Sequence, residues 1–353
     1  MTSKFSSFIQ RLAITCVIGF ISCSQVAAQN VKPASTKSVG ALRIVEKARV
    51  LLSTGKQDAA LELLSTQLRV TPNDYGVRQL LGTIYYQKND FPRTIQHISS
   101  ALENPASNPS ERWQMVQMLA LSHYALGHFK DAIPYLEQVQ ANVPNNTEIA
   151  YALGNSYVIT HDAGKARASY ARLFQVSPDS AAAHLINAQM MVRQQFEEVA
   201  EKELRRAAEL DPKLSQVNFM LGEMAIYRAR IDEGIGFLSK EITLNPGFGM
   251  AYYRLGEALT RQLKWTEAIA PLQKAVLLNP NFSGSYIVLG KVYLKQNNLD
   301  NAEAMLRRAS QMDPNNFSAH HLLAQVLQQA NRPDEARREL QIAEQLRGTT
   351  PTK

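Results

Sequence analysis

Seven histidines and two cysteines are the side chains of this sequence best suited to bind a metal ion or to act as nucleophiles. No two histidines have the His-Glu-x-x-His spacing of a helical zinc site, and none has a cysteine or aspartate partner at metal-ligand spacing. His184 and His320 fall where the surrounding helical pattern requires a large packing residue. We therefore predict that the protein binds no metal and needs no cofactor.

The motifs of common catalytic sites are also missing from the sequence. It has no Gly-x-Ser-x-Gly nucleophile elbow. Gly234-Ile235-Gly236 lies in a helical segment, whereas a phosphate-binding loop follows a strand. These absences predict a protein that is not an enzyme.

Residues 1–28 have the three parts of a secretory signal peptide. Basic residues precede an apolar run over residues 12–21, and small residues follow it up to Ala28. We expect cleavage after Ala28, which leaves residues 29–40 as a flexible polar tether. The protein is then exported, either into the periplasm or out of the cell.

Both cysteines, Cys16 and Cys23, lie inside this N-terminal segment. Cleavage after Ala28 removes them, so the mature chain has neither disulfides nor thiolate metal ligands. However, Phe20-Ile21-Ser22-Cys23 distantly resembles a bacterial lipobox, in which the cysteine receives a lipid. The alternative is therefore an outer-membrane-associated lipoprotein anchored through Cys23. Without that lipid we expect no membrane contact.

The formal net charge of +7 is of the sign found in many nucleic-acid-binding proteins. The basic residues are interleaved with glutamate, as in Glu201-Lys202-Glu203-Leu204-Arg205-Arg206, and such mixed runs usually form solvated helix faces. Export also separates the protein from nucleic acid. We therefore predict protein partners and no nucleic-acid partner.

The elements that would position any functional residue are set by an internal repeat. Six prolines recur at one constant interval, namely Pro144, Pro178, Pro212, Pro246, Pro280 and Pro314. The residue before a proline is pushed out of helical geometry, so each proline ends a helix. Polar residues after several of these prolines can cap the next helix, as at Asn145-Asn146, Asp179-Ser180, Asn281 with Ser283, and Asn315-Asn316. A period of about 34 residues indicates a solenoid of stacked helical repeats.

Small residues recur at two positions in the repeat, with apolar residues at three- and four-residue spacing between them. That spacing is typical of an amphipathic helix. The first position holds glycine in several repeats, including Gly154, Gly222, Gly256 and Gly290. Glycine inside a helix costs about 1 kcal/mol relative to alanine, so its recurrence needs a packing reason. It predicts two helices that approach closely as an antiparallel hairpin.

These residues resemble the tetratricopeptide repeat, whose pattern has a large residue, Leu-Gly, Tyr, Ala, a second large residue, Ala and Pro. Residues 283–316 carry this pattern as Tyr286, Leu289-Gly290, Tyr293, Ala302, Leu306, Ala309 and Pro314. The resemblance implies an all-α fold, an α-α superhelix or solenoid of about nine helix-turn-helix repeats.

In this register the nine repeats are least regular at their N-terminal end. The first two, over residues 41–108, are degenerate, because one lacks the glycine and the other ends in a loop with two prolines. A four-residue insertion at 109–112 indicates a kink or a subdomain boundary. Seven further repeats occupy 113–350, and residues 351–353 form a tail.

In tetratricopeptide arrays the first helices of successive repeats line a concave groove, which holds extended or helical segments of partner proteins. The resemblance implies groove positions for Tyr86, Tyr124, Tyr151, Asn155, Phe219, Tyr227, Tyr253, Arg254, Glu257, Arg261, Lys291 and Lys295. The alternative for the aromatic residues is packing between repeats. The family's carboxylate clamp is absent, because its lysine and asparagine positions hold residues such as Val45 and Leu80.

The sequence therefore predicts a non-catalytic protein-protein interaction scaffold or adaptor in the cell envelope. Preformed helices would bind a partner segment through several shallow contacts. The alternative is a lipid-anchored structural subunit of an envelope assembly, secretion, pilus or polysaccharide-export machine.

Overall fold

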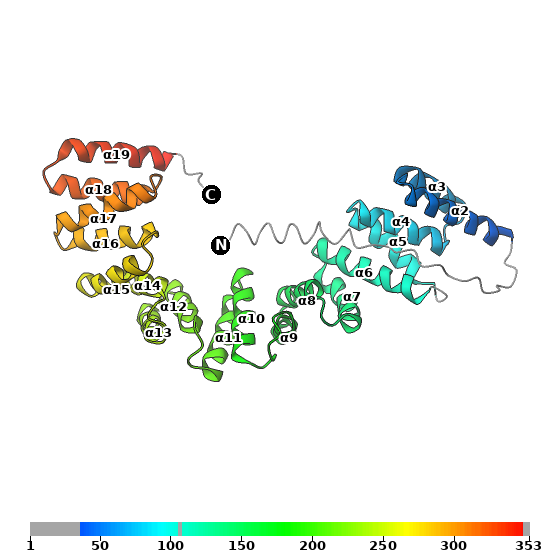
Figure 1. The fold of residues 1–353 in the computed structure, drawn as a ribbon, viewed down its shortest axis with the longest axis horizontal. Helices are drawn as coiled ribbons and strands as arrows, with labels where there is room; N and C mark the ends of the chain where they lie inside the picture. Colours follow the sequence, from blue (N-terminus) through cyan, green and yellow to red (C-terminus); the bar gives the residue numbers. More distant parts are fainter. Residues whose placement is uncertain (1–35, 105–107, 349–353) are drawn as a thin grey trace. The chain divides into compact units, whose positions relative to one another are not determined.

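A computed structural model describes residues 36–104 and 108–348 of the chain (Figure 1). The described residues form eighteen helices and no strand, which confirms the predicted all-α fold. Within these two ranges, no helix combines the length and the apolar character needed to cross a membrane.

Several predictions fall on other parts of the chain. The signal peptide, Cys23, residues 29–35 of the tether and the tail at 351–353 lie outside the described residues. Residues 36–40, which were predicted to be tether, are instead helical, because the first described helix already begins at Thr36.

The chain divides into two compact units, and the division falls after Pro178. In unit 1 the helices are α2 (Thr36–Ser53), α3 (Gln57–Val70), α4 (Tyr75–Gln87), α5 (Phe91–Leu102), α6 (Pro109–Ala125), α7 (Phe129–Asn142), α8 (Thr147–Ile159) and α9 (Ala163–Leu173). In unit 2 they are α10 (Ala181–Arg193), α11 (Glu197–Leu210), α12 (Val217–Tyr227), α13 (Ile231–Leu244), α14 (Gly249–Arg261), α15 (Trp265–Leu278), α16 (Ser283–Lys295), α17 (Leu299–Met312), α18 (Phe317–Gln329) and α19 (Pro333–Gly348). Each even-numbered helix pairs with the odd-numbered helix that follows it.

The turn inside each helix pair contains one residue in the left-handed conformation. These residues are Gly55, Asn89, Gly127, His161, Gln195, Ala229, Leu263, Asn297 and Asn331. The next amide donates to the carbonyl five residues back, as from Asp90 N to Tyr85 O at 2.9 Å. This closure satisfies carbonyls at the end of the first helix, so it fixes the geometry of every hairpin in the described residues.

The recurring glycines lie where the two helices of a pair approach most closely. A Cβ atom on Gly256 would lie 2.4 Å from Leu272 Cγ, and one on Gly290 would lie 2.6 Å from Leu306 Cγ. Both leucines are fully buried. The predicted close approach of the two helices is therefore confirmed.

Several second helices end two residues before the repeated proline, as predicted. For example, α11 ends at Leu210 before Pro212. Helix α9 differs, because it ends at Leu173, five residues before Pro178. Gln175 adopts a left-handed φ of 56°, and this turn stops the helix early, next to the division between the two units.

Three of the predicted helix caps are present. Asn146, Ser180 and Asn316 each accept hydrogen bonds from amides in the first turn of the following helix. The cap predicted from Asn281 and Ser283 is wrong. Ser283 is already the first residue of α16, and the cap position is held by Phe282, which makes no side-chain cap bond.

The insertion at 109–112 does not interrupt the core. Ile98 of α5 packs in one buried cluster with Met115 and Leu119 of α6. Arg112 Nη1 also donates to the carbonyl of Leu102 at 2.9 Å, which closes the C-terminal end of α5. The two compact units therefore divide elsewhere, and the insertion is accommodated between packed helices.

Helix α12 begins with an arrangement of its own. Gln216 has a left-handed φ of 73°, and no side chain of its own segment caps the helix. Instead, the carboxylate of Glu241 accepts hydrogen bonds from the amides of Gln216 at 3.0 Å and Phe219 at 3.3 Å. Glu241 is fully buried. A carboxylate at a helix N-terminus compensates the positive end of the helix dipole.

Candidate partner-binding cleft

Unit 2 contains a cleft of about 420 Å³, built mainly from the first helices of three successive pairs. Its apolar lining residues are Val192 of α10 and Met220, Met224, Ile226 and Tyr227 of α12. Its charged lining residues are Glu197, Glu223, Arg228, Arg254, Glu257 and Arg261. We call the apolar lining residues the floor of the cleft and the six charged ones, three acidic and three basic, its rim.

The apolar floor is suited to side chains of more than one shape. Met220 and Met224 lie one helical turn apart on α12, and methionine adapts its flexible side chain to different partners. Tyr227, at the end of the same helix, is 81% exposed. An exposed aromatic ring beside an apolar floor is a typical anchor for a protein partner.

The charged rim is held in place by ion pairs. Arg254 donates to Glu223 at 2.8 Å and to Glu257 at 2.9 Å, and Arg261 donates to Glu257 at 3.0 Å. Burial alone would lower the pKa of Arg254, but the bonds and charges of Glu257 and Glu223 raise it. The guanidinium therefore stays charged and ordered at the edge of the cleft.

Four of the twelve predicted groove residues line this cleft: Tyr227, Arg254, Glu257 and Arg261. The prediction missed the other seven lining residues. Two of these, Met220 and Glu223, each lie one repeat before a predicted position, Arg254 and Glu257 respectively. Equal spacing on successive first helices was therefore the signal that could have found them.

Four other predicted groove residues lie on first helices of unit 1: Tyr86 on α4, Tyr124 on α6, and Tyr151 and Asn155 on α8. Asn155 Nδ2 donates to the hydroxyl of Tyr124 at 3.2 Å, which brings these two together. Burial, together with the nearby Tyr151, raises the pKa of Tyr124 to about 12, so its hydroxyl stays neutral.

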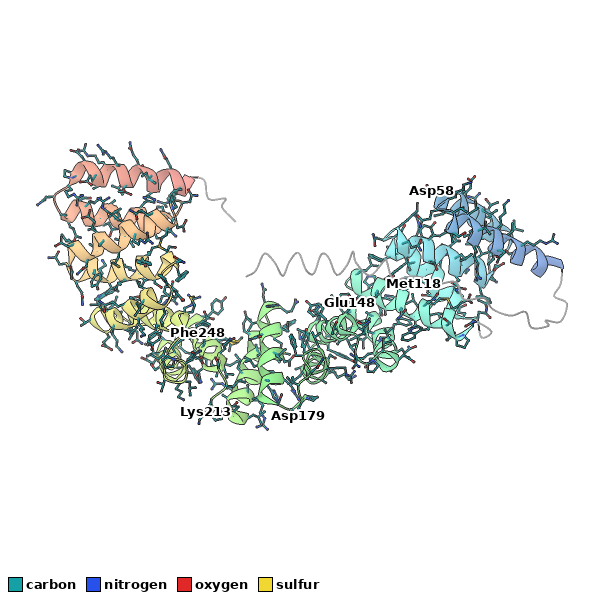
Figure 2. The ribbon with its side chains drawn as sticks, viewed as in Figure 1. Asp58, Met118, Glu148, Asp179, Lys213 and Phe248 are labelled. Atoms are coloured by element: carbon teal, nitrogen blue, oxygen red, sulfur yellow. The ribbon has the colours of Figure 1, made fainter. Side chains whose placement is uncertain are left out.

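Phe219 and Tyr253 take part in packing between repeats. The ring of Phe219 meets that of Phe248 edge to face at 4.8 Å, and Tyr253 meets Phe282 in the same way at 4.9 Å. Phe248, labelled in Figure 2, lies in the connection that leads into α14. These two contacts occupy the same positions in adjacent repeats.

Lys291 and Lys295, the remaining predicted groove residues, are exposed on α16. Neither lysine is among the residues that line the cleft.

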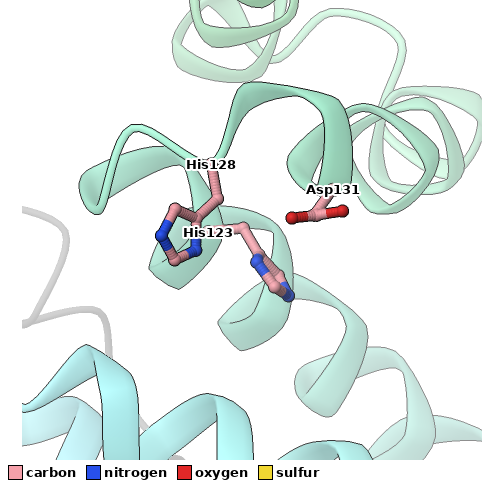
Figure 3. A group of neighbouring side chains, drawn as sticks. All are labelled: His123, His128 and Asp131. Atoms are coloured by element: carbon pink, nitrogen blue, oxygen red, sulfur yellow. The ribbon is translucent and has the colours of Figure 1, made fainter.

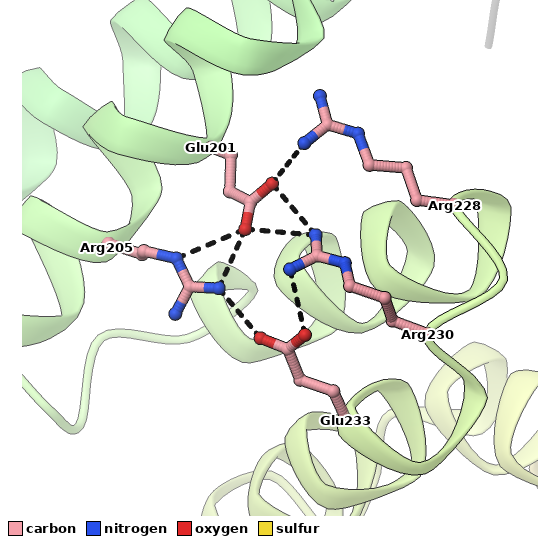
Figure 4. A network of polar contacts seen from close by, with 5 residues as sticks. All are labelled: Glu201, Arg205, Arg228, Arg230 and Glu233. Atoms are coloured by element: carbon pink, nitrogen blue, oxygen red, sulfur yellow. Dashed lines mark hydrogen bonds and ion pairs between the residues drawn. The ribbon is translucent and has the colours of Figure 1, made fainter.

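Figure 4 shows a network of ion pairs among Glu201, Arg205, Arg228, Arg230 and Glu233. Glu201 of α11 accepts hydrogen bonds from Arg205, Arg228 and Arg230, and Glu233 joins Arg205 to Arg230. Arg228 belongs to both the network and the cleft lining. The network therefore fixes the connection between α12 and α13 at the edge of the cleft.

Two buried histidines have packing roles, as the sequence predicted. His184 Nδ1 lies 2.7 Å from Glu203, and His320 Nδ1 lies 2.6 Å from Glu339. The two pairs occupy equivalent positions of the repeat, one in α10 and α11 and the other in α18 and α19.

A third group of titratable side chains gathers at the turn between α6 and α7 (Figure 3). One ligand atom each from His123, His128 and Asp131 lies within 4.8 Å of the other two. The prediction that no histidine has an aspartate partner at ligand spacing was therefore wrong. The turn brings together residues that do not follow the spacing of a single helix.

Comparison with known families identifies the repeats. Models described as tetratricopeptide repeat match residues 118–173, 250–281 and 293–349. The chain thus contains tetratricopeptide repeats in both of its units. No curated protein matches the chain.

Three solved structures illustrate the similarity of parts of the chain to known proteins. MamA of Desulfovibrio magneticus RS-1 is 20% identical, with a TM-score of 0.46 over 49% of this chain and 98% of that one. YrrB, described as having an unusual peptide-binding site, is 19% identical, with a TM-score of 0.47 over 53% and 94%. PilF of Pseudomonas aeruginosa is 19% identical, with a TM-score of 0.48 over 58% and 93%.

Proposed function

We propose that the protein is a non-catalytic interaction scaffold of the cell envelope, which binds an extended or helical segment of a partner protein. The cleft between α10, α12 and α14 is the observation that carries the proposal. Tetratricopeptide repeats generally serve as protein-interaction scaffolds, and three stretches of this chain match that repeat.

The lining of the cleft indicates what the partner segment contains. Met220, Met224 and Val192 favour an apolar side chain that enters the cleft, with Tyr227 covering it from the edge. The acidic and basic rim residues are equal in number, three of each, so net charge gives little attraction. The expected ligand therefore carries an apolar or aromatic anchor flanked by uncharged polar residues or by residues of both charge signs.

To test whether the cleft binds such segments, we would first select peptides from a random library for binding to the full chain. The affinity of these peptides is then measured for variants of the cleft. Met220→Asp places a charge on the apolar floor, and Tyr227→Ala removes the exposed ring. We expect each change to weaken peptide binding at least about tenfold, as the loss of an interface anchor does. Fluorescence anisotropy of the labelled peptides measures this.

Leu277→Ala is the matched control, because Leu277 is 70% exposed on α15 and is not part of the cleft lining. This variant should bind the peptides as the unchanged protein does. Equal affinities for all three variants would show that the peptides bind elsewhere, and the assignment of the cleft would be rejected.

The envelope location is supported by the basic, apolar and small residues that succeed one another within residues 1–28. Mass spectrometry of the mature protein from a cell-envelope fraction tests it. A mature N-terminus at Gln29 supports a protein exported without a lipid, whereas a lipid on Cys23 supports the anchored form. An intact N-terminus in the cytosolic fraction would contradict both.

A further inference from the structure

The turn between α6 and α7 brings together three side chains that can act as metal ligands. His123 lies in the last turn of α6, His128 directly precedes α7, and Asp131 lies in the first turn of α7. Their ligand atoms lie within 4.8 Å of one another. None of the three lines the cleft proposed above to bind a partner.

The backbone holds these residues at a fixed spacing. Gly127, with a φ of 74°, allows the tight turn, and His128 N donates to the carbonyl of His123 at 2.9 Å. The amides of Asp131 and Ala132 in turn donate to the carbonyl of His128 at 3.1 and 2.9 Å. The three Cα atoms are therefore positioned by the hairpin itself.

His123 is the most constrained of the three. Its ring stacks on Tyr135, with the centroids 5.8 Å apart and the planes 5° from parallel. Its Nδ1 atom is buried and has no hydrogen-bond partner among the described residues. A buried ring nitrogen normally has a partner, so this one needs an explanation. His128 and Asp131 are exposed, and their side chains can rotate toward it.

We propose that His123, His128 and Asp131 bind one divalent transition-metal ion of borderline softness, such as Zn²⁺. Two imidazoles and one carboxylate are ligands that zinc accepts, at distances of about 2.0–2.2 Å. Two donor atoms that share a tetrahedral zinc ion at these bond lengths lie about 3.3 Å apart. The exposed side chains of His128 and Asp131 would therefore need only a small rotation from the present separations of up to 4.8 Å. Three protein ligands leave at least one coordination position for water or for a group from a partner.

The electrostatics of the turn limit the strength of the site. The positive N-terminal end of α7 opposes a cation, and the carboxylate of Asp131 offsets this effect. Binding of Zn²⁺ at this turn should therefore need all three side chains. Loss of either exposed ligand should weaken Zn²⁺ binding at least about tenfold, as the loss of groups around metal sites commonly does.

Isothermal titration of the full chain with ZnCl₂, in a buffer that does not chelate metals, tests the proposal. The unchanged protein should show one Zn²⁺ site that is absent, or at least about tenfold weaker, in His128→Ala and in Asp131→Asn. The two cysteines are present in all three proteins, so any zinc that they bind cancels in the comparison. His161→Ala is the matched control, because His161 is exposed in the equivalent turn between α8 and α9.

Histidine NMR gives a second readout that does not depend on stoichiometry. Zn²⁺ should shift the ring resonances of His123 and His128 and leave those of His161 unchanged. Circular dichroism of each variant confirms that it is folded. If the unchanged protein and folded His128→Ala give the same isotherm, or if the His123 resonances do not respond to Zn²⁺, the site does not exist.

Discussion

At the residue scale, one ion-pair network recurs at equivalent repeat positions. Glu201, Arg205, Arg230 and Glu233 have counterparts in Glu303, Arg307, Arg332 and Glu335, three repeats further along the chain. In the second network Glu303 accepts from Arg307 and Arg332, and both arginines also pair with Glu335. Each network links the second helix of one pair to the turn and second helix of the next.

The central carboxylates make these networks sensitive to acid. Burial alone would raise the pKa of Glu201, but hydrogen bonds from Arg205 and Arg230 outweigh it and lower the pKa below its ordinary value of 4.5. Glu303 is lowered in the same way by Arg307 and Arg332. Because the folded pKa lies below the unfolded one, this stabilisation is present above about pH 4.5. It is lost as the pH falls through the folded pKa.

The double variant Glu201→Gln, Glu303→Gln should therefore lose stability at pH 7, by about 1–2 kcal/mol for each network, between the values for surface and buried ion pairs. Its remaining stability should fall less steeply than that of the unchanged protein below about pH 4.5. Urea unfolding followed by circular dichroism at a series of pH values measures both effects. Parallel pH profiles for the two proteins would contradict this role of the carboxylates.

At the element scale, the contact between the two helices of a pair decides which glycines matter. Gly256 lies against the fully buried Leu272. Gly236, on α13, has no other atom within 4 Å of the place where a Cβ would lie. Both glycines lie inside helices, but a Cβ atom would meet a neighbouring side chain at Gly256 and open space at Gly236.

Substitution of each glycine by alanine separates these two situations. Gly256→Ala should destabilise the protein by about 1–3 kcal/mol, because the new methyl group overpacks the contact with Leu272. Gly236→Ala should stabilise it by about 0.5–1 kcal/mol, because alanine is the better helix former. Urea midpoints of the two variants give the comparison. Effects of the same sign would contradict the close approach of α14 and α15.

Many of the helix ends and the close helix-helix contacts could be predicted from the sequence, because proline and glycine act on the backbone directly. A proline such as Pro212 follows the end of a second helix in most repeats, with the earlier end of α9 before Pro178 as the exception, and Gly256 marks a close contact. The start of α12 could not be predicted in this way. It depends on the carboxylate of Glu241 from another helix, at a position where the neighbouring repeats carry Ala275 and Ala309.

The candidate site was only partly predictable for a related reason. The repeat register correctly located side chains such as Arg254 on first helices, but it does not distinguish a lining residue from a packing residue. Phe219 and Tyr253 are partly buried against aromatic rings that precede the next first helix. Their environment depends on the neighbouring repeat, which a single-repeat pattern does not contain.

At the scale of the whole molecule, stacked helix pairs contact mainly their neighbours, so the stability of each unit is a sum of local terms. The cleft uses α10, α12 and α14, so it exists only where three consecutive pairs stack. The binding surface proposed for this protein is therefore spread over several helix pairs and needs no enclosed core. It also predicts that a partner segment contacts several repeats at once.

Site-specific photo-crosslinking in cells that express the protein tests this central claim most directly. A benzophenone amino acid replaces Tyr227 at the cleft in one variant and Leu277 on α15 in another. We expect the probe at position 227 to form an adduct with one contiguous segment of a partner protein, and the probe at 277 to form none with that segment. Adducts with that segment at both positions, or no adduct at position 227, would contradict binding in the cleft.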